Sequence, residues 1–469
     1  MTEREFDVVV LGAGPAGEVC AGRLGESGLD VAVVESHLLG GECSYYACMP
    51  SKGMLRPGEL LTEVRRIPGV AEAVTGELDA AAVLRRRDEI VHHLDDSSQV
   101  AWLESRNVTV FRSPGRLDGE RRVVAGDDTL VARKAVVVAT GSSPLIPPID
   151  GLREAEPWTN REATTAEEVP GRLAILGGGV VGVEMAQAYS SLGSTVTVIE
   201  RGDRLIPREE PFASDDVEQS LREKGVDVML GTSAAAVRAE NGEVTVETGE
   251  GGPVRADELL VAIGRRLNSD DIGLDTVGLE PGRPVDVDDS MRSPAHDWLY
   301  AIGDVNGRAL LTHMGKYQAR IAADVILGYP TGCVNTTADG SRSPRVIFTD
   351  PHVAAVGYTL DAAQQDGLNV RAVDVPTQGN AGASFYGRDD ARGTTRLVVD
   401  EDRNVIVGAT FTGPEVAEFL QAATIAVVGE VPLDRLFHAV PSFPTRSEVW
   451  LYLLEKLGLA GPCGGPQRS

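Results

Sequence analysis

A glycine-rich turn between a strand and a helix occurs twice in this chain, and no other feature limits the fold more strongly. The first copy, at residues 12–17, reads GAGPAG and has its glycines at Gly12, Gly14 and Gly17. It follows an apolar strand predicted at Phe6–Val10, and the next predicted strand, Val31–Val34, ends at Glu35. Such a turn brings a helix N-terminus and open backbone to a pyrophosphate, and the acid accepts hydrogen bonds from a ribose diol. The pattern predicts a dinucleotide-binding unit.

The second copy of this pattern, at residues 177–182, reads GGGVVG and has its glycines at Gly177, Gly179 and Gly182. It follows a strand predicted at Leu173–Leu176, and the strand Thr195–Ile199 ends at Glu200. Two complete units predict two bound dinucleotides. Glu200 favours NADH, because an acid there hydrogen-bonds a ribose 2′-hydroxyl and repels a 2′-phosphate. Arg201 and Arg204 follow at once and leave NADPH open as the alternative.

The length and the charge of the chain exclude several classes of protein. Its 469 residues predict about three domains of ordinary size. There is no apolar run of about eighteen residues and no signal-peptide pattern, so we expect no membrane insertion and a cytoplasmic location. A net charge of −26 argues against nucleic acid and anionic membranes as partners, because both would repel this surface.

Two of the five cysteines, Cys43 and Cys48, lie close together in the segment GGECSYYACMPSK at residues 40–52. A regular helix would hold their Cα atoms about 8.7 Å apart, beyond the roughly 7 Å that a disulfide spans, so a bridge requires a distorted turn. A bridge across so short a loop stabilises little and is easily reduced. The pair is therefore either redox-active or two unbridged core thiols, and the nucleotide-binding units favour the first reading.

The segment from residue 56 to 105 is predicted to be mainly helical, with Arg85, Arg86 and Arg87 on an exposed face. His92 and His93 are adjacent in the sequence, so their side chains point to different faces of any regular element. We therefore predict no metal site.

Taken together, these motifs resemble the FAD-dependent pyridine nucleotide-disulfide oxidoreductases, the family of lipoamide dehydrogenase, glutathione reductase and mercuric reductase. The resemblance covers nearly the whole chain. Besides the glycine-rich turns and the cysteine segment, the matching pieces are ATG at 139–141, AIGRR at 262–266, AIGD at 301–304 and the segment 346–359.

The resemblance implies an α/β fold with two Rossmann-like dinucleotide-binding domains, one for FAD and one for NAD(P)H, and a C-terminal α+β domain that forms a homodimer. We expect the FAD-binding domain at residues 1–150 and the NAD(P)H-binding domain at 151–270. Residues 271–340 would return to the FAD domain, and 341–469 would form the dimerisation domain with a Gly/Pro-rich tail.

The resemblance also implies roles for individual residues. Glu35 would hold the FAD ribose and Asp304 the ribityl chain, while Thr140, Gly141 and Gly264 belong to the cofactor-binding segments. Cys48 would be the charge-transfer thiol beside the flavin, and Cys43 the interchange thiol that meets the substrate. Lys52 would lie near flavin N5, paired with Glu184. A lysine there would stabilise the reduced flavin anion and lower the pKa of a nearby thiol.

The chain departs from this family at its C-terminal signature, which normally reads His-Pro-Thr-x-Ser-Glu and supplies the partner subunit's acid/base histidine. Here the frame runs from Phe443 to Glu448, and phenylalanine cannot accept or donate the proton. General acid/base catalysis contributes about 10² to 10⁴-fold, so an ordinary thiol substrate would react slowly. His438 is one candidate substitute.

Two other features bear on the missing base. Tyr45 and Tyr46, between the cysteines, could donate a proton, crowd the disulfide or simply pack. Cys463 could relay electrons from the C-terminal tail, although it is single where relatives with such relays carry pairs.

The sequence thus predicts an enzyme in which NADH, or alternatively NADPH, reduces FAD and the flavin reduces Cys43–Cys48. The dithiol would then reduce a small-molecule acceptor other than lipoamide or glutathione, such as a non-standard disulfide. A second hypothesis is an NAD(P)H reductase for a quinone, metal ion or dye, whose acceptor needs no histidine. A third is a non-catalytic flavin-binding protein, which the two intact nucleotide motifs disfavour.

Overall fold

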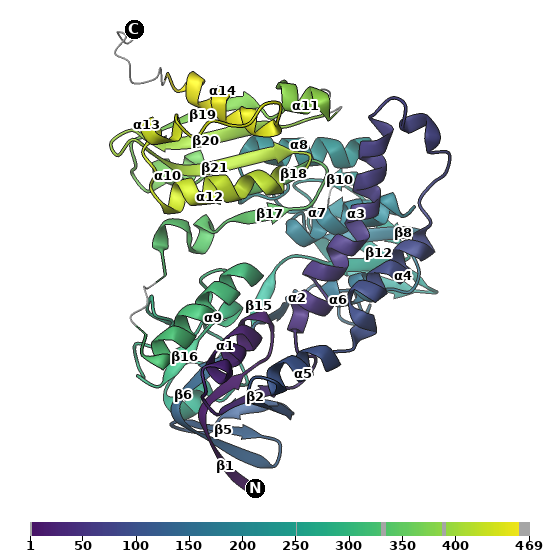
Figure 1. Cartoon of the computed structure of the whole chain (residues 1–469). Helices are drawn as coiled ribbons and strands as arrows, with labels where there is room; N and C mark the ends of the chain where they lie inside the picture. Colours follow the sequence, from purple (N-terminus) through teal and green to yellow (C-terminus); the bar gives the residue numbers. More distant parts are fainter. Residues whose placement is uncertain (1, 250, 330–333, 387–390, 459–469) are drawn as a thin grey trace.

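Three main sheets, of seven, four and five strands, and their covering helices make up the described fold, with smaller sheets of three and two strands beside them (Figure 1). The computed structural model describes residues 2–249, 251–329, 334–386 and 391–458. The first sheet has seven strands in the order β3-β2-β1-β6-β5-β4, with β16 paired to β6. The strands are β1 (Thr2–Leu11), β2 (Val31–Glu35), β3 (Val108–Arg112), β4 (Gly115–Leu117), β5 (Arg122–Ala125), β6 (Asp128–Val138) and β16 (Leu299–Ala301).

The central strands of this sheet are parallel and buried on both faces, which explains their continuous apolar sequence. Helices α1 (Pro15–Glu26) and α9 (Thr312–Leu327) pack against each other beside it (Figure 1). Small residues make this approach possible, because a Cβ atom at Gly303 or Gly315 would lie 3.3 Å from the side chain of Ala16. Helix α5 (Ser97–Glu104) covers β3.

The second sheet repeats the same strand–turn–helix construction with four parallel strands in the order β10-β9-β8-β14. A three-stranded antiparallel sheet, β11-β12-β13, lies beside it. The elements are β8 (Arg172–Leu176), α7 (Val180–Ser191), β9 (Thr195–Ile199), α8 (Pro211–Glu223), β10 (Asp227–Met229), β11 (Ala234–Glu240), β12 (Glu243–Thr248), β13 (Val254–Ala256) and β14 (Glu258–Val261).

Two links join the first unit to the second. The outgoing link contains β7 (Ser142–Pro144) and α6 (Asn160–Thr165), and the returning link contains β15 (Arg265–Leu267). Strands β7 and β15 pair antiparallel, so the two links run side by side.

The third sheet is antiparallel in the order β17-β18-β21-β20-β19, and α12 and α14 lie against it (Figure 1). Strand β21 is buried at every position. The strands are β17 (Arg345–Ile347), β18 (His352–Gly357), β19 (Val370–Pro376), β20 (Thr394–Asp400) and β21 (Val405–Gly413). The helices are α10 (Leu360–Gln365), α11 (Ala381–Phe385), α12 (Leu420–Val428), α13 (Leu433–Leu436) and α14 (Val449–Lys456).

The helices between the first two units are α2 (Gly41–Tyr45), α3 (Cys48–Arg65) and α4 (Ala80–Ile90). The expected arginine face on α4 is wrong at Arg87, whose side chain is 1% exposed. Its guanidinium donates to the carbonyl of Ala166 at 2.8 Å and pairs with Asp88, so it ties α4 to the outgoing link. Among the helices the structure describes, none is long and apolar enough to cross a membrane.

Candidate active site

The two glycine-rich turns have the same backbone geometry. Gly12 and Gly177 have φ angles of 103° and 109°, in the region that favours glycine. A Cβ atom at Gly12 would lie 2.5 Å from the carbonyl oxygen of Ala139, and one at Gly177 would lie 2.6 Å from that of Ala262. The third glycine of each turn packs against the carbonyl of the first, at Gly17 and at Gly182.

The middle glycine of each turn, by contrast, faces open space. A Cβ atom built at Gly14 or at Gly179 would have no neighbour within 4 Å. Each position opens at the N-terminus of a helix, α1 or α7, where backbone N–H groups attract phosphate. Both turns therefore fit the pyrophosphate of a dinucleotide.

The acids at the ends of β2 and β9 occupy equivalent positions. Glu35 accepts hydrogen bonds from the backbone N–H groups of Ala13 (2.7 Å) and His37 (2.8 Å). Glu200 accepts from Gly178 and Gly202, both at 2.6 Å. Each carboxylate is thus fixed beside its glycine-rich turn, where it could hold a ribose. Arg201, the candidate phosphate-binding cation, is exposed next to Glu200.

The predicted cofactor segments of the first unit meet around β7. Asn268 bonds the carbonyl of Thr140 at 2.9 Å and that of Gly141 at 3.0 Å. Ser142 donates to the carboxylate of Asp304 at 2.5 Å. Burial raises the pKa of Asp304, and the bond from Ser142 opposes that shift. Gly264 lies where the chain returns, and its carbonyl accepts from Leu145.

The two cysteines lie on either side of a break between helices. Helix α2 ends at Tyr45, and Tyr46 and Ala47 leave helical geometry with φ angles of −132° and −139° before α3 begins at Cys48. The turn is therefore distorted, as bridging requires. The structure has Cys43 and Cys48 as free thiols.

The two thiols differ in acidity. A hydrogen bond from Cys43 lowers the pKa of Cys48 to about 6, with further help from Thr312 and the charge of Lys52, while burial and Glu184 oppose. The same bond, with burial, raises the pKa of Cys43. The Cys48 sulfur lies 3.5 Å from the hydroxyl of Thr312 on α9. Cys48 is thus the member of the pair that carries the thiolate.

The predicted pair of Lys52 and Glu184 forms across the two units, with 2.7 Å between the ammonium nitrogen and a carboxylate oxygen. The second oxygen of Glu184 accepts from the backbone N–H of Phe348 at 2.9 Å. The lysine nitrogen also lies 4.9 Å from the centre of the Phe348 ring. Glu184 is therefore held at both oxygens.

The candidates for the missing base are placed as follows. Phe443 is 76% exposed, and His438 is also exposed, with its ring edge-on to Phe437. Glu448 is buried, and its Oε2 atom has no hydrogen-bond partner among the described residues. The carboxylate that should orient the family's histidine is present without that histidine. Cys463 lies outside the described residues.

Neither tyrosine between the cysteines donates to a sulfur in the described structure. Tyr45 is 1% exposed and its hydroxyl approaches the carbonyl of Asp95 at 3.4 Å. The hydroxyl of Tyr46 lies 3.0 Å from Nε2 of His37, and the two rings stack. Packing is the role that this geometry supports.

Several residues of the site were not found from the sequence. They are Thr312, Phe348, Asn268, Glu42 and Asn160, and their contacts join elements far apart in the chain. In the parts of the chain that the structure describes, no three His, Cys, Asp or Glu side chains gather closely enough to hold a metal ion.

Comparison with known proteins identifies the class. Residues 6–321 match the family "Pyridine nucleotide-disulphide oxidoreductase", and residues 343–453 match the dimerisation domain of the same family. The chain therefore belongs to the pyridine nucleotide-disulphide oxidoreductases.

Individual relatives cover almost the full length. Dihydrolipoyl dehydrogenase of Chlamydia muridarum is 31% identical over 452 residues, covering 95% of each chain. Mercuric reductase of Acidithiobacillus ferrooxidans is 32% identical over 468 residues, covering 97% of this chain and 82% of the relative. Among solved structures, LpdA from Mycobacterium tuberculosis has a TM-score of 0.83 and 27% identity, covering 97% of this chain and all of the other. RclA from Escherichia coli, with a TM-score of 0.84 and 24% identity over 96% of this chain and 99% of the other, shares the fold.

Membership confirms the α/β fold with Rossmann-like sheets and a C-terminal dimerisation domain. The protein is an oxidoreductase of a family that binds FAD and a pyridine nucleotide. The dimerisation domain indicates a homodimer.

Proposed function

We propose that this protein uses NADH to reduce the Cys43–Cys48 disulfide through FAD, and that the dithiol then reduces a small-molecule acceptor. The observation that carries the proposal is the asymmetry of the pair, with Cys48 acidic beside Lys52 and Thr312, and Cys43 as its hydrogen-bond donor. FAD, when bound, would pass the two electrons of a hydride from the nicotinamide to the disulfide. Lys52 would stabilise the negative charge that reaches the disulfide, and Glu184 would hold Lys52 in place.

The preference for NADH follows from the equivalence of Glu35 and Glu200. Both carboxylates are held by one bond from the glycine-rich turn and one from the residue two positions after them. The ribose of the FAD adenosine carries a free 2′-hydroxyl, so a site built in the same way suits the unphosphorylated ribose of NADH. The exposed Arg201 and the half-buried Arg204 leave weaker use of NADPH open.

The dithiol would act by thiol–disulfide exchange. Cys43 passes its proton to the Cys48 thiolate as it attacks an acceptor disulfide and releases the first thiolate. Cys48 then loses that proton to solvent, attacks the mixed disulfide, releases the second thiolate and reforms the bridge. Two electrons pass to the acceptor, and one proton passes to solvent. Phe443 cannot protonate the leaving sulfur as a histidine there would, so the acceptor should release an acidic thiol that leaves as its anion. This defines the non-standard disulfide as one with a low-pKa leaving group.

The decisive experiment is anaerobic reduction by NADH followed by alkylation and mass spectrometry. We expect Cys43 and Cys48 to become alkylated only after NADH is added, while Cys20, buried and with its pKa raised to about 12 by that burial, stays unlabelled. Cys48→Ser should abolish disulfide turnover, and Cys20→Ser should not. A Cys48→Ser enzyme with full turnover would overturn the proposal.

The acceptor class is tested by restoring the base. Phe443→His should raise turnover with lipoamide at least tenfold, and leave turnover with an aromatic disulfide of acidic leaving thiol within about twofold. An equal effect on both disulfides would contradict the assignment of the acceptor.

A second candidate acceptor is a soft metal ion. It is favoured because two unbridged sulfurs lie within hydrogen-bonding distance and a metal ion needs no proton, and because a relative at 32% identity is named a mercuric reductase. NADH oxidation driven by Hg²⁺ faster than by any disulfide, and lost in Cys43→Ser, would favour this acceptor.

A further inference from the structure

The segment between the two cysteines is held from outside by the helix α6. Pro50 occupies the position whose N–H would bond the carbonyl of Tyr46 in a continuous helix, and proline has no N–H. The carbonyl of Tyr46 instead accepts from the side-chain amide of Asn160 at 2.7 Å and from the hydroxyl of Thr164 at 3.1 Å, both buried. The helix break that separates Cys43 from Cys48 thus depends on partners supplied by α6.

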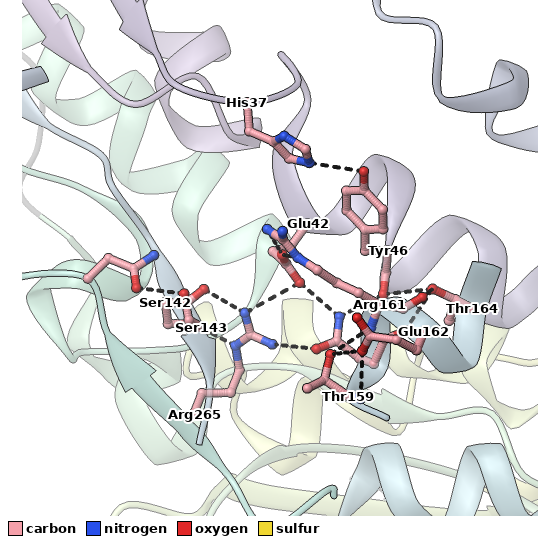
Figure 2. A network of polar contacts seen from close by, with 12 residues as sticks. His37, Glu42, Tyr46, Ser142, Ser143, Thr159, Arg161, Glu162, Thr164 and Arg265 are labelled. Carbon is pink, nitrogen blue, oxygen red and sulfur yellow. Dashed lines mark hydrogen bonds and ion pairs between the residues drawn. The ribbon is translucent and has the colours of Figure 1, made fainter. Parts of the chain in front are cut away.

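Asn160 also forms a hydrogen bond on the other side of the turn, next to Cys43. Its amide nitrogen donates to the carboxylate of Glu42, the residue before Cys43, at 2.8 Å. Arg161, the next residue of α6, pairs with Glu42 at 2.5 Å and places its guanidinium 4.8 Å from the ring centre of Tyr46. Arg265 approaches Glu42 at 3.7 Å from the returning link. Figure 2 shows Glu42, Tyr46, Arg161 and Arg265 converging in this way.

We infer that Asn160 is a positioning residue that holds Cys43 and Cys48 at bridging distance by bonding both flanks of the turn at once. The residue is 6% exposed, and its side-chain oxygen accepts from Arg265 at 3.4 Å, so each polar atom of the amide is used. Without these bonds the turn can relax to conformations in which the Cα atoms lie further apart than the roughly 7 Å that a disulfide spans. A dithiol tolerates that relaxation and a disulfide does not.

The inference rests on the proposed redox role of the pair, and it concerns the equilibrium between disulfide and dithiol. The FAD-loaded enzyme is equilibrated anaerobically in mixtures of reduced and oxidised dithiothreitol, and the free thiols are then alkylated and counted by mass spectrometry. In this exchange the protein disulfide takes two electrons and two protons from the dithiol reagent, which closes to its cyclic disulfide. The ratio of the reagents at half-reduction gives the equilibrium constant.

For Asn160→Ala we expect the equilibrium constant for disulfide formation to fall about tenfold, a shift of about 30 mV toward easier reduction. Thr164→Val removes the second bond to the Tyr46 carbonyl, together with the hydroxyl's bonds to the carbonyls of Asn160 (2.8 Å) and Arg161 (3.3 Å) in its own helix. It should give a smaller change in the same direction. Thr165→Ala is the matched control, because its hydroxyl bonds only the carbonyl of Arg161 in the same helix. It should leave the equilibrium constant unchanged.

The outcomes separate a positioning role from a structural one. An Asn160→Ala enzyme with a lower melting temperature but the wild-type equilibrium constant would overturn the inference. If that variant does not retain FAD, Thr164→Val decides, and an unchanged constant there would equally overturn it. A wild-type enzyme in which Cys43 and Cys48 never form a disulfide in any mixture would instead refute the proposed function.

Discussion

At the scale of single residues, the acidity of Cys48 is set by charges that come from different units of the fold. Lys52 lies one turn further along α3, and Glu184 lies on α7 of the second unit. Lys52 lowers the pKa of the thiol and Glu184 raises it. The two side chains are paired with each other, and substituting one at a time shows in which direction each of them shifts the pKa of the Cys48 thiol.

We predict that Lys52→Met and Glu184→Gln shift the pKa of Cys48 in opposite directions, each by about one unit. Loss of the cation should raise the pKa, and loss of the carboxylate should lower it, while glutamine still accepts from the N–H of Phe348. The measurement is the rate of alkylation of Cys48 in the reduced enzyme as a function of pH. Shifts of the same sign would show that the pair acts on the thiol only through packing.

Glu18, on the first turn of α1, gives a prediction about stability. Burial raises its pKa to about 7 from an ordinary 4.5, with Asp96 and Glu35 adding to the shift and Lys316 opposing it. The folded protein therefore binds this proton more tightly than the unfolded chain, so the free energy of unfolding falls as the pH rises from about 4.5 to about 7.

Glu18→Gln should consequently gain roughly 2 kcal/mol over the wild type at pH 8 and almost nothing at pH 4.5. Thermal or urea unfolding at the two pH values measures the difference. Glu26→Gln, an exposed position at the end of the same helix, is the control and should show no such dependence. A gain at pH 8 no larger than at pH 4.5 would contradict the shifted pKa of Glu18.

At the scale of elements, the decisive feature is the interruption between α2 and α3. Pro50 removes one helical N–H at the point where the chain must turn, and a second proline, Pro57, lies within α3 without any cysteine beside it. Substituting each proline in turn therefore distinguishes a missing helical hydrogen bond next to the cysteines from a missing bond elsewhere in α3.

Pro50→Ala should let residue 50 donate to the carbonyl of Tyr46 and draw α2 and α3 toward one continuous helix. We expect the rate at which oxidised dithiothreitol closes the disulfide in the reduced enzyme to fall several-fold, with Pro57→Ala unchanged. Alkylation of samples quenched over time gives the rate. Equal slowing in both variants would mean that helix stiffness in general, not the break itself, controls closure.

Features that depend on residues close together in the chain were predicted from the sequence, and features that depend on distant residues were not. Both strand–turn–helix units were predicted because glycine geometry and apolar runs are local signals. Arg87 was wrongly placed on the surface because its partner, the carbonyl of Ala166, lies 79 residues away. The edge strand Val370–Pro376 was missed because its mixed sequence pairs only through β20. The contacts of Asn160 to the cysteine turn join residues 114 and 118 positions apart, so no local sequence pattern predicts them.

At the scale of the whole molecule, buried ion pairs fix the dimerisation domain to the second nucleotide-binding unit. Arg345 forms two bonds to Glu209, at 2.7 and 2.9 Å, and Arg396 pairs with Glu210 at 2.8 Å. Both glutamates are buried, so moving the dimerisation domain away from the second unit would break these ion pairs and leave the carboxylates without their partners. These pairs occupy one side of the dimerisation domain, so a second copy would cover a face that they leave exposed.

Helix α12 offers such a face. Ala422, Ile425 and Val428 are exposed at three-residue intervals, so they form one apolar stripe, and Ile425 is 59% exposed. An aspartate there would have to be buried without a partner if the stripe lies in the interface, which costs several kcal/mol.

We predict that Ile425→Asp converts the homodimer to a monomer in light scattering at micromolar concentration. Ile67→Asp, an exposed isoleucine outside the dimerisation domain, should remain dimeric. A dimer that withstands the charge at Ile425 would place the interface on another face, such as the one that carries Val440 and Phe443, the most exposed large apolar side chains among the described residues of this domain.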